Sequence, residues 1–138
     1  MSEKCMFESC VKKHGDKIYL VFRIIVGFLF FQHGVQKLFG WFGGSVVEIG
    51  SLIGAAGVIE IVVGLAVLLG LFTRLAALLG GLEMIVAYVM MHSPNGWNPL
   101  LNYGEPAVLY FAAFCVLHVY GAGKYLCFEK YILKKENF

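Results

Sequence analysis

The residues that could do chemistry in this chain lie within hydrophobic stretches, where an isolated charge is costly. Residues 23–40 are apolar enough to enter a bilayer, yet they include Arg23, His33 and Lys37. At 100° per residue, Lys37 lies about 40° and His33 about 80° around a helix from Arg23. The three groups therefore form one stripe, which must face protein or water because lipid does not tolerate it. Such donors could polarise a ligand held beside them.

Two acids occupy the middle of the next two apolar stretches, and a histidine follows in the fourth. At a rise of 1.5 Å per residue, Glu60 and Glu83 fall within about 3 Å of the membrane midplane, and His118 lies slightly to one side. A charge at the centre costs roughly 2.5–3.5 kcal/mol. We therefore expect Arg23 to pair with one acid. Because one arginine cannot neutralise two carboxylates, we expect the other acid to hold a proton.

The polar residues separate by depth into two predicted groups. The core group contains Arg23, His33, Glu60, Glu83 and His118, and the outer group contains Lys37, His92 and Glu105. Two interpretations stay open: the cluster lines a binding or catalytic site, or its ion pairs only fix the register of the helices. No metal site is predicted, because the spacing of Cys5, Cys10 and His14 fits no common one.

Four helices must position these side chains. Hydrophobic residues make up 59% of the 138-residue chain and charged residues 14%, against roughly 45–50% and about 25% in soluble domains. The apolar stretches predict helices at 17–40, 46–71, 74–92 and 105–127, each long enough for a hydrocarbon core of about 30 Å. We therefore predict an all-α fold, a four-helix transmembrane bundle formed by residues 17–127.

The segments outside the predicted bundle are basic and indicate its orientation. Residues 1–16 are expected to form a cytoplasmic or interfacial segment, and residues 128–138 a basic cytoplasmic tail. Lysines flank the first and last helices, and Arg74 lies in the second connection, so the positive-inside rule places both termini in the cytoplasm. The net charge of +2 is small, so no nucleic-acid partner is expected.

Small residues accompany both central acids. Ala56, Gly57 and Gly64 lie within about 60° of Glu60 on a helical wheel. Glycines beside a polar residue are typical of close helix contacts in membranes. The helix that carries Glu83 repeats the pattern, with small residues on the same face: Ala76, Gly80 and Ala87.

These motifs recur in order along the chain, and the chain resembles the DoxX family of small membrane proteins. The matching pieces are Arg23, Gly27-Phe-x-x-x-x-His33-Gly34-x-x-Lys37-Leu, Gly57-x-x-Glu60-x-x-x-Gly64, Gly70-x-x-Thr73-Arg74, Glu83-x-x-x-Ala87, His92, Asn102-Tyr-Gly104-Glu105 and Gly121-Ala-Gly123-Lys124. The resemblance implies a four-helix protein of the prokaryotic cytoplasmic membrane. It also implies relatives that serve as a subunit of a thiosulfate:quinone oxidoreductase or in oxidant defence.

Three functions remain open at this stage. The first is a quinone-linked oxidoreductase subunit, or a redox component in oxidative-stress defence, in which Glu60, Glu83, His33 and Arg23 are catalytic. Its cofactor would be a quinone, bound by Arg23, His33, Lys37 and His118, with Lys37, His92 and Glu105 at the rim. The second is a non-enzymatic assembly scaffold, and the third is a small-solute carrier. The expected partners are the lipid bilayer, another membrane or redox subunit, and a second copy of the chain.

Overall fold

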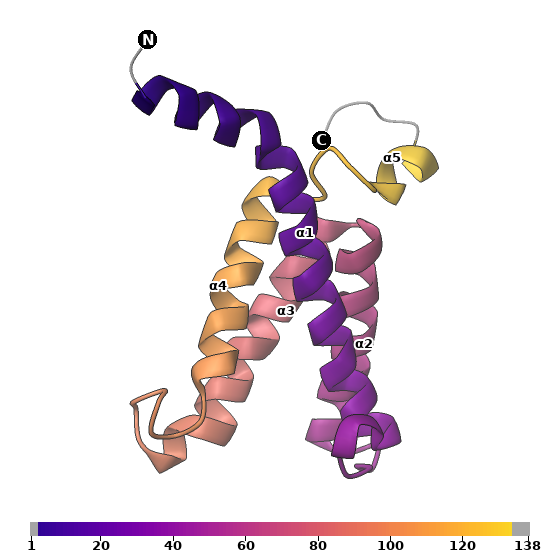
Figure 1. Ribbon diagram of the computed structural model, residues 1–138. Helices are drawn as coiled ribbons and strands as arrows, with labels where there is room; N and C mark the ends of the chain where they lie inside the picture. Colours follow the sequence, from indigo (N-terminus) through magenta and orange to yellow (C-terminus); the bar gives the residue numbers. More distant parts are fainter. Residues whose placement is uncertain (1–2, 134–138) are drawn as a thin grey trace.

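In the described part of the chain, residues 3–133 of the computed structural model, all regular secondary structure is helical and there is no strand. Figure 1 shows the arrangement. The helices are α1 (Glu3–Phe39), α2 (Leu52–Leu69), α3 (Thr73–Ala87), α4 (Glu105–Tyr120) and α5 (Phe128–Leu133). A 3₁₀ turn at Trp41–Gly43 follows α1, and α3 continues as a π-helical turn, Tyr88–His92, and a 3₁₀ turn, Ser93–Asn95.

Three of the described helices are long and apolar enough to cross a membrane. They cover Val11–Phe39, Leu52–Leu69 and Thr73–Asn95. Helix α4 is apolar but has 16 residues, a length of about 24 Å. Large apolar side chains on these helices point outward: Val62 is 61%, Leu75 57% and Leu109 62% exposed. An exterior this apolar matches a lipid solvent and not water.

The helix ends differ from the predicted ones for local reasons. Helix α1 begins at Glu3 and not at residue 17, and its first turns bend away from the rest (Figure 1). Helix α2 begins at Leu52 and not at residue 46, because the hydroxyl of Ser51 caps it by accepting a hydrogen bond from the Gly54 N–H. The prediction that the fourth helix reaches residue 127 is wrong. Helix α4 stops at Tyr120, because Gly121 has a positive φ of 65°.

The side chains of Cys5 and Cys10, and all of residues 134–138 of the predicted tail, lie outside the described part of the chain.

Helix α1 packs most extensively against α2, and α3 against α4. The α1–α2 contact is close because glycines line it: a Cβ on Gly34 would lie 2.5 Å from the Gly57 oxygen, and one on Gly64 would lie 2.5 Å from the Phe31 nitrogen. The predicted close contact through Gly57 and Gly64 is therefore confirmed. Helices α1 and α4 meet instead through aromatic rings, such as Phe30 against Phe114 at 4.7 Å between centroids.

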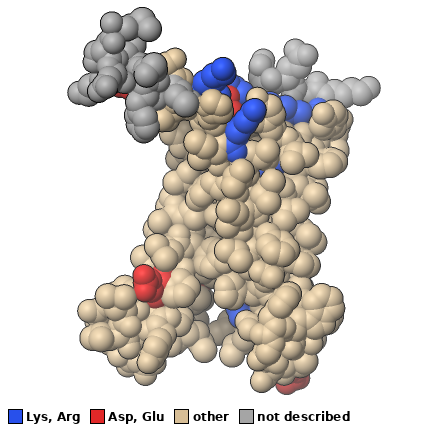
Figure 2. Space-filling model, in the orientation of Figure 1, with Lys and Arg blue, Asp and Glu red and all other residues tan. Residues whose placement is uncertain are grey.

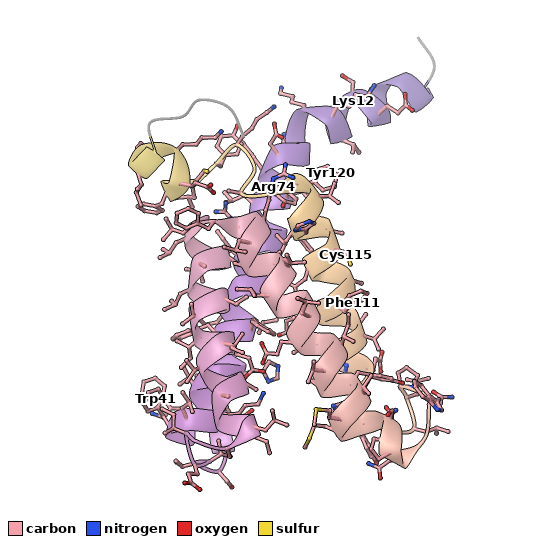
Figure 3. All side chains as sticks on the ribbon, turned by 180° about the vertical axis from the view of Figure 1, so that it is seen from behind. Lys12, Trp41, Arg74, Phe111, Cys115 and Tyr120 are labelled. Atoms are coloured by element: carbon pink, nitrogen blue, oxygen red, sulfur yellow. The ribbon has the colours of Figure 1, made fainter. Side chains whose placement is uncertain are left out.

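The two helix pairs meet at one end of the molecule and separate at the other. The end that carries α5 and the beginning of α1 gathers most of the visible Lys and Arg side chains, whereas the opposite end is split into two lobes (Figures 1 and 2). We call the first the closed end and the second the open end. In Figure 3, Arg74 and Tyr120 mark the closed end, and Trp41 marks the open end.

Candidate functional site

An ion pair joins α1 to α2 at the open end. The Lys37 Nζ lies 2.5 Å from the Glu60 Oε1, and the Glu60 side chain is only 3% exposed. Gly57, one turn before Glu60, lets the lysine approach, because a Cβ on this glycine would lie 3.2 Å from the Lys37 Cβ. The predicted pairing of a central acid with Arg23 is therefore wrong. The cation beside Glu60 is Lys37, whose long stem brings its charge inward from the rim.

Glu83 of α3 completes a cluster of three ionisable groups with this pair. It interacts electrostatically with Glu60 and with Lys37. Both of its carboxyl oxygens are buried, and neither makes a hydrogen bond within the described residues. One lysine therefore faces two acids, which is the charge imbalance expected from the sequence with a different cation. A buried carboxyl without a partner is costly when ionised, so the arrangement is least costly when one of the two acids is protonated.

A cavity of about 620 Å³ lies beside the cluster, between α2 and α3. Its polar lining comes from Lys37, Glu83 and His92, and the rest is apolar. Many of the apolar side chains, including Leu82 at 52% and Met90 at 53%, are exposed. The cavity is therefore open to the exterior and not enclosed by the helices. Its volume is within the range of about 300–1,000 Å³ typical of small-molecule sites.

Helix α4 adds a residue that the sequence analysis did not single out. Tyr110 packs its ring edge-to-face against His33, with 5.6 Å between centroids, and interacts electrostatically with Glu60. His33 in turn interacts with Lys37. Helices α1, α2, α3 and α4 thus each contribute to one polar row: His33, Lys37, Glu60, Glu83 and Tyr110. The signal in the sequence was weak, because Tyr110 is one of several aromatic residues in an apolar helix.

Arg23 belongs to the closed end, 14 residues before Lys37 and so about 21 Å away along α1. Its side chain is completely buried. It donates hydrogen bonds to the backbone oxygens of Ala122 and Leu126, the latter at 2.7 Å. Residues 121–127, which we call the C-terminal strap, are held to α1 by these bonds. Arg23 therefore has a structural role here and does not join the acids.

Three further contacts hold the strap and the neighbouring helix ends. The Tyr19 hydroxyl donates to the Gly121 oxygen at 2.6 Å. His118, the predicted fourth-helix site residue, lies 2.9 Å through Nδ1 from the Arg74 oxygen, and Arg74 donates back to the His118 oxygen at 3.2 Å. His118 is exposed at the closed end. It joins α3 to α4 and lies outside the cluster that was predicted to include it.

The predicted rim residues, Lys37, His92 and Glu105, also lie in different places. His92 lines the cavity, and its Nδ1 lies 3.0 Å from the Asn102 oxygen. Asn102 is buried and donates to the Gly96 oxygen at 2.6 Å, so it organises the loop between α3 and α4. Glu105 is exposed in the first turn of α4 and lines a different hollow, next to Tyr110. Of the predicted outer group, only Lys37 and His92 border the large cavity.

Comparison with known proteins agrees with these observations. The family model described as DoxX matches residues 18–93, which include Lys37, Glu60, Glu83 and His92. An uncharacterised protein of Haemophilus influenzae is 36% identical over 131 residues, covering 90% of this chain and 98% of that protein. No solved structure matches the chain. The family match covers more than half of the sequence, and the Haemophilus relative extends the likeness through α4. The chain belongs to the DoxX family of membrane proteins.

Proposed function

We propose that the chain is a four-helix transmembrane protein of the cytoplasmic membrane, with both termini in the cytoplasm, that binds a quinone as a subunit of a quinone-linked oxidoreductase. The single observation that carries this proposal is the cavity between α2 and α3, which is mainly apolar, open to the exterior and polar at Lys37 and Glu83. The gathering of Lys and Arg at the closed end supports the orientation (Figure 2).

The residues present fit a quinone at this position. A quinone has an apolar tail and a ring with two carbonyl oxygens, which accept hydrogen bonds. The unpartnered Glu83 carboxyl, when protonated, and the Lys37 ammonium are the donors on the cavity wall. The exposed apolar walls, such as Leu82 and Met90, offer a route for a tail between the site and lipid. Arg23 and His118, at the closed end, have no part in this binding.

The chemistry of the site divides between the ligand, the chain and a partner. When bound, a quinone supplies the redox chemistry, since it becomes a quinol by gaining two electrons and two protons. Lys37 orients and polarises a carbonyl, and Glu83 holds a proton within the apolar surroundings. Glu60 keeps Lys37 in place through their ion pair. The electrons are expected from a partner redox subunit, so the chain would act within a complex.

The test is a binding titration of the purified chain in lipid nanodiscs with a short-tailed ubiquinone and a short-tailed naphthoquinone. We expect saturable binding to one site. Lys37→Met and Glu83→Gln should each weaken it about tenfold, equivalent to about 1.4 kcal/mol. Glu48→Gln is the matched control, because Glu48 is an exposed acid in the loop before α2 and does not line the cavity.

A steric pair of variants makes the same test without changing charge. Ala56→Phe places a ring in the cavity and should abolish binding, whereas Ala112→Phe adds the same ring to an exposed position on α4 and should not. Equal affinities in these two variants, with both folded, would place any quinone outside this cavity and refute the proposal.

The scaffold alternative is favoured by one observation: the Lys37–Glu60 pair joins α1 to α2 as a purely structural ion pair would. It predicts no saturable quinone binding and a Glu60→Gln variant that is less stable but otherwise unchanged. The titration above therefore decides between the two functions.

A further inference from the structure

A second, smaller hollow lies on the surface of α1 near the open end. It has a volume of about 250 Å³ and is lined by Gln32, His33 and Gln36 together with Leu29 and Phe42. It shares no lining residue with the large cavity. His33 is six residues before the end of α1, so its backbone is about 9 Å from that end. Two amides beside an exposed histidine make this groove suitable for water at the membrane surface.

His33 connects this groove to the ion cluster inside the bundle. Lys37 follows it by four residues on α1, so the two side chains are neighbours on one helix face, and they interact electrostatically. On its other side, the His33 ring contacts Tyr110 of α4, which interacts with Glu60 of α2. From Lys37 the row continues to Glu60 at 2.5 Å and to Glu83 of α3 at the cavity.

The charge balance of the cluster indicates why a path for protons along this row of residues is needed. Lys37 can neutralise one of Glu60 and Glu83, so the cluster is neutral only while one proton is held on a carboxyl. If that proton passes to a ligand in the cavity, it must be replaced, because a second bare carboxylate is costly in apolar surroundings. While a ligand fills the cavity, the replacement must come from another side of the cluster. The groove at His33 is a polar surface on another side, and His33 connects it to Lys37 of the cluster.

We propose that His33 is the proton entry from this groove into the Lys37–Glu60–Glu83 cluster. His33 transfers a proton between water in the groove and the row, with Lys37 and Tyr110 as its inner neighbours, while the ligand occupies the opposite side of the cluster. The delivery of this proton to a quinone rests on the proposed function. The entry itself rests on the groove, the ring contact and the ion pair, and it can be tested without any quinone.

The experiment measures how fast the cluster exchanges its proton with solvent. The chain in nanodiscs is mixed rapidly with heavy water, and the infrared band of the protonated carboxyl is followed as it shifts; Glu83→Gln and Glu60→Gln assign the band. We expect His33→Phe and His33→Gln to slow the exchange by roughly 10²-fold, the contribution of a positioned acid–base group. Added imidazole should restore the rate in His33→Ala, because His33 borders a surface groove.

His118→Phe is the matched control, because His118 is also an exposed histidine but lies at the closed end; its exchange rate should equal that of the wild type. Unfolding temperatures identify any variant that does not fold. Wild-type exchange in both folded His33 variants, or a cluster without a protonated carboxyl, would overturn the inference. Wild-type exchange in the folded His33 variants would not affect the quinone titration, and a failed titration would leave the exchange result standing, so the two proposals can fail separately.

Discussion

The closed and open ends of the bundle each hold a cation from α1, but they surround it differently. At the closed end, Arg23 is completely buried and donates to two neutral backbone oxygens of the strap. At the open end, Lys37 is 31% exposed, pairs with Glu60 and faces a second acid, Glu83. The first cation is enclosed by backbone, whereas the second borders a large cavity.

The difference teaches that a charged side chain in this fold can either stabilise the structure or take part in a cluster that binds a proton. The groups around the side chain determine which of these roles it has. Carbonyl oxygens do not titrate, so Arg23 keeps one state and fixes the strap in one position. Two carboxyls beside one lysine have a charge that depends on a proton, and the adjacent cavity gives a ligand access to it. The predictions below act on one end at a time.

The largest expected effect is on stability at the closed end. Arg23→Met removes two charge-assisted hydrogen bonds and leaves the oxygens of Ala122 and Leu126 without these donors. The loss should be about 3–6 kcal/mol, since such bonds contribute roughly 1.5–3 kcal/mol each. Thermal unfolding in detergent and protease cleavage within the strap measure it.

Arg23→Lys is the matched control for this change. It keeps the charge but can no longer reach both oxygens in the planar geometry of a guanidinium, so it should recover only part of the stability. Quinone affinity should stay near the wild-type value in both folded variants. An unfolding temperature unchanged in Arg23→Met would show that the strap is held by other contacts.

A smaller effect is expected from a double-mutant cycle at the open end. Glu60→Gln alone should be tolerated, because Glu83 remains as an acid near Lys37. Glu83→Gln alone leaves the Lys37–Glu60 pair intact. The double variant leaves Lys37 without any acid, so its loss should exceed the sum of the single losses by about 1–3 kcal/mol. Denaturation in detergent measures all four proteins, and strictly additive losses would show that the two acids do not share the lysine.

The features of the fold that depend on helical periodicity could be predicted from the sequence. The apolar stretches predicted four helices, although the fourth ends earlier than expected, and Gly57 and Gly64 beside Glu60 were correctly expected to line a close helix contact. An imbalance of one cation and two acids was also expected, although with Arg23 as the cation, because lipid restricts where charges can lie. Each of these inferences needs only the helical repeat and the cost of a charge in hydrocarbon.

The partner of each cation could not be predicted in the same way. The acceptors for Arg23 are backbone oxygens, which have no sequence signature. They belong to the strap, which was predicted to be helical. The strap leaves the helical path at positive-φ residues, Gly121, Gly123 and Leu126. With Arg23 turned to the strap, Lys37 became the cation for Glu60. The sequence analysis had placed that lysine at the rim. The depth of a residue along a helix gives the position of its Cα and not the position of the end of a flexible side chain.

The smallest effect is expected for the ion pair at the surface of the closed end. The Lys124 Nζ lies 2.7 Å from the Asp16 Oδ2, with both side chains well exposed. The hydrogen bond to the Asp16 carboxylate raises the pKa of Lys124 above its ordinary 10.5. Any stability from the pair is therefore fully present at neutral pH and is lost only as the pH rises through that raised pKa. Because water and salt screen exposed charges, Lys124→Ala should leave the unfolding temperature unchanged in physiological salt at pH 7. A clear loss there, comparable to that of Arg23→Met, would mean that the strap is anchored at its surface and that the buried guanidinium is secondary.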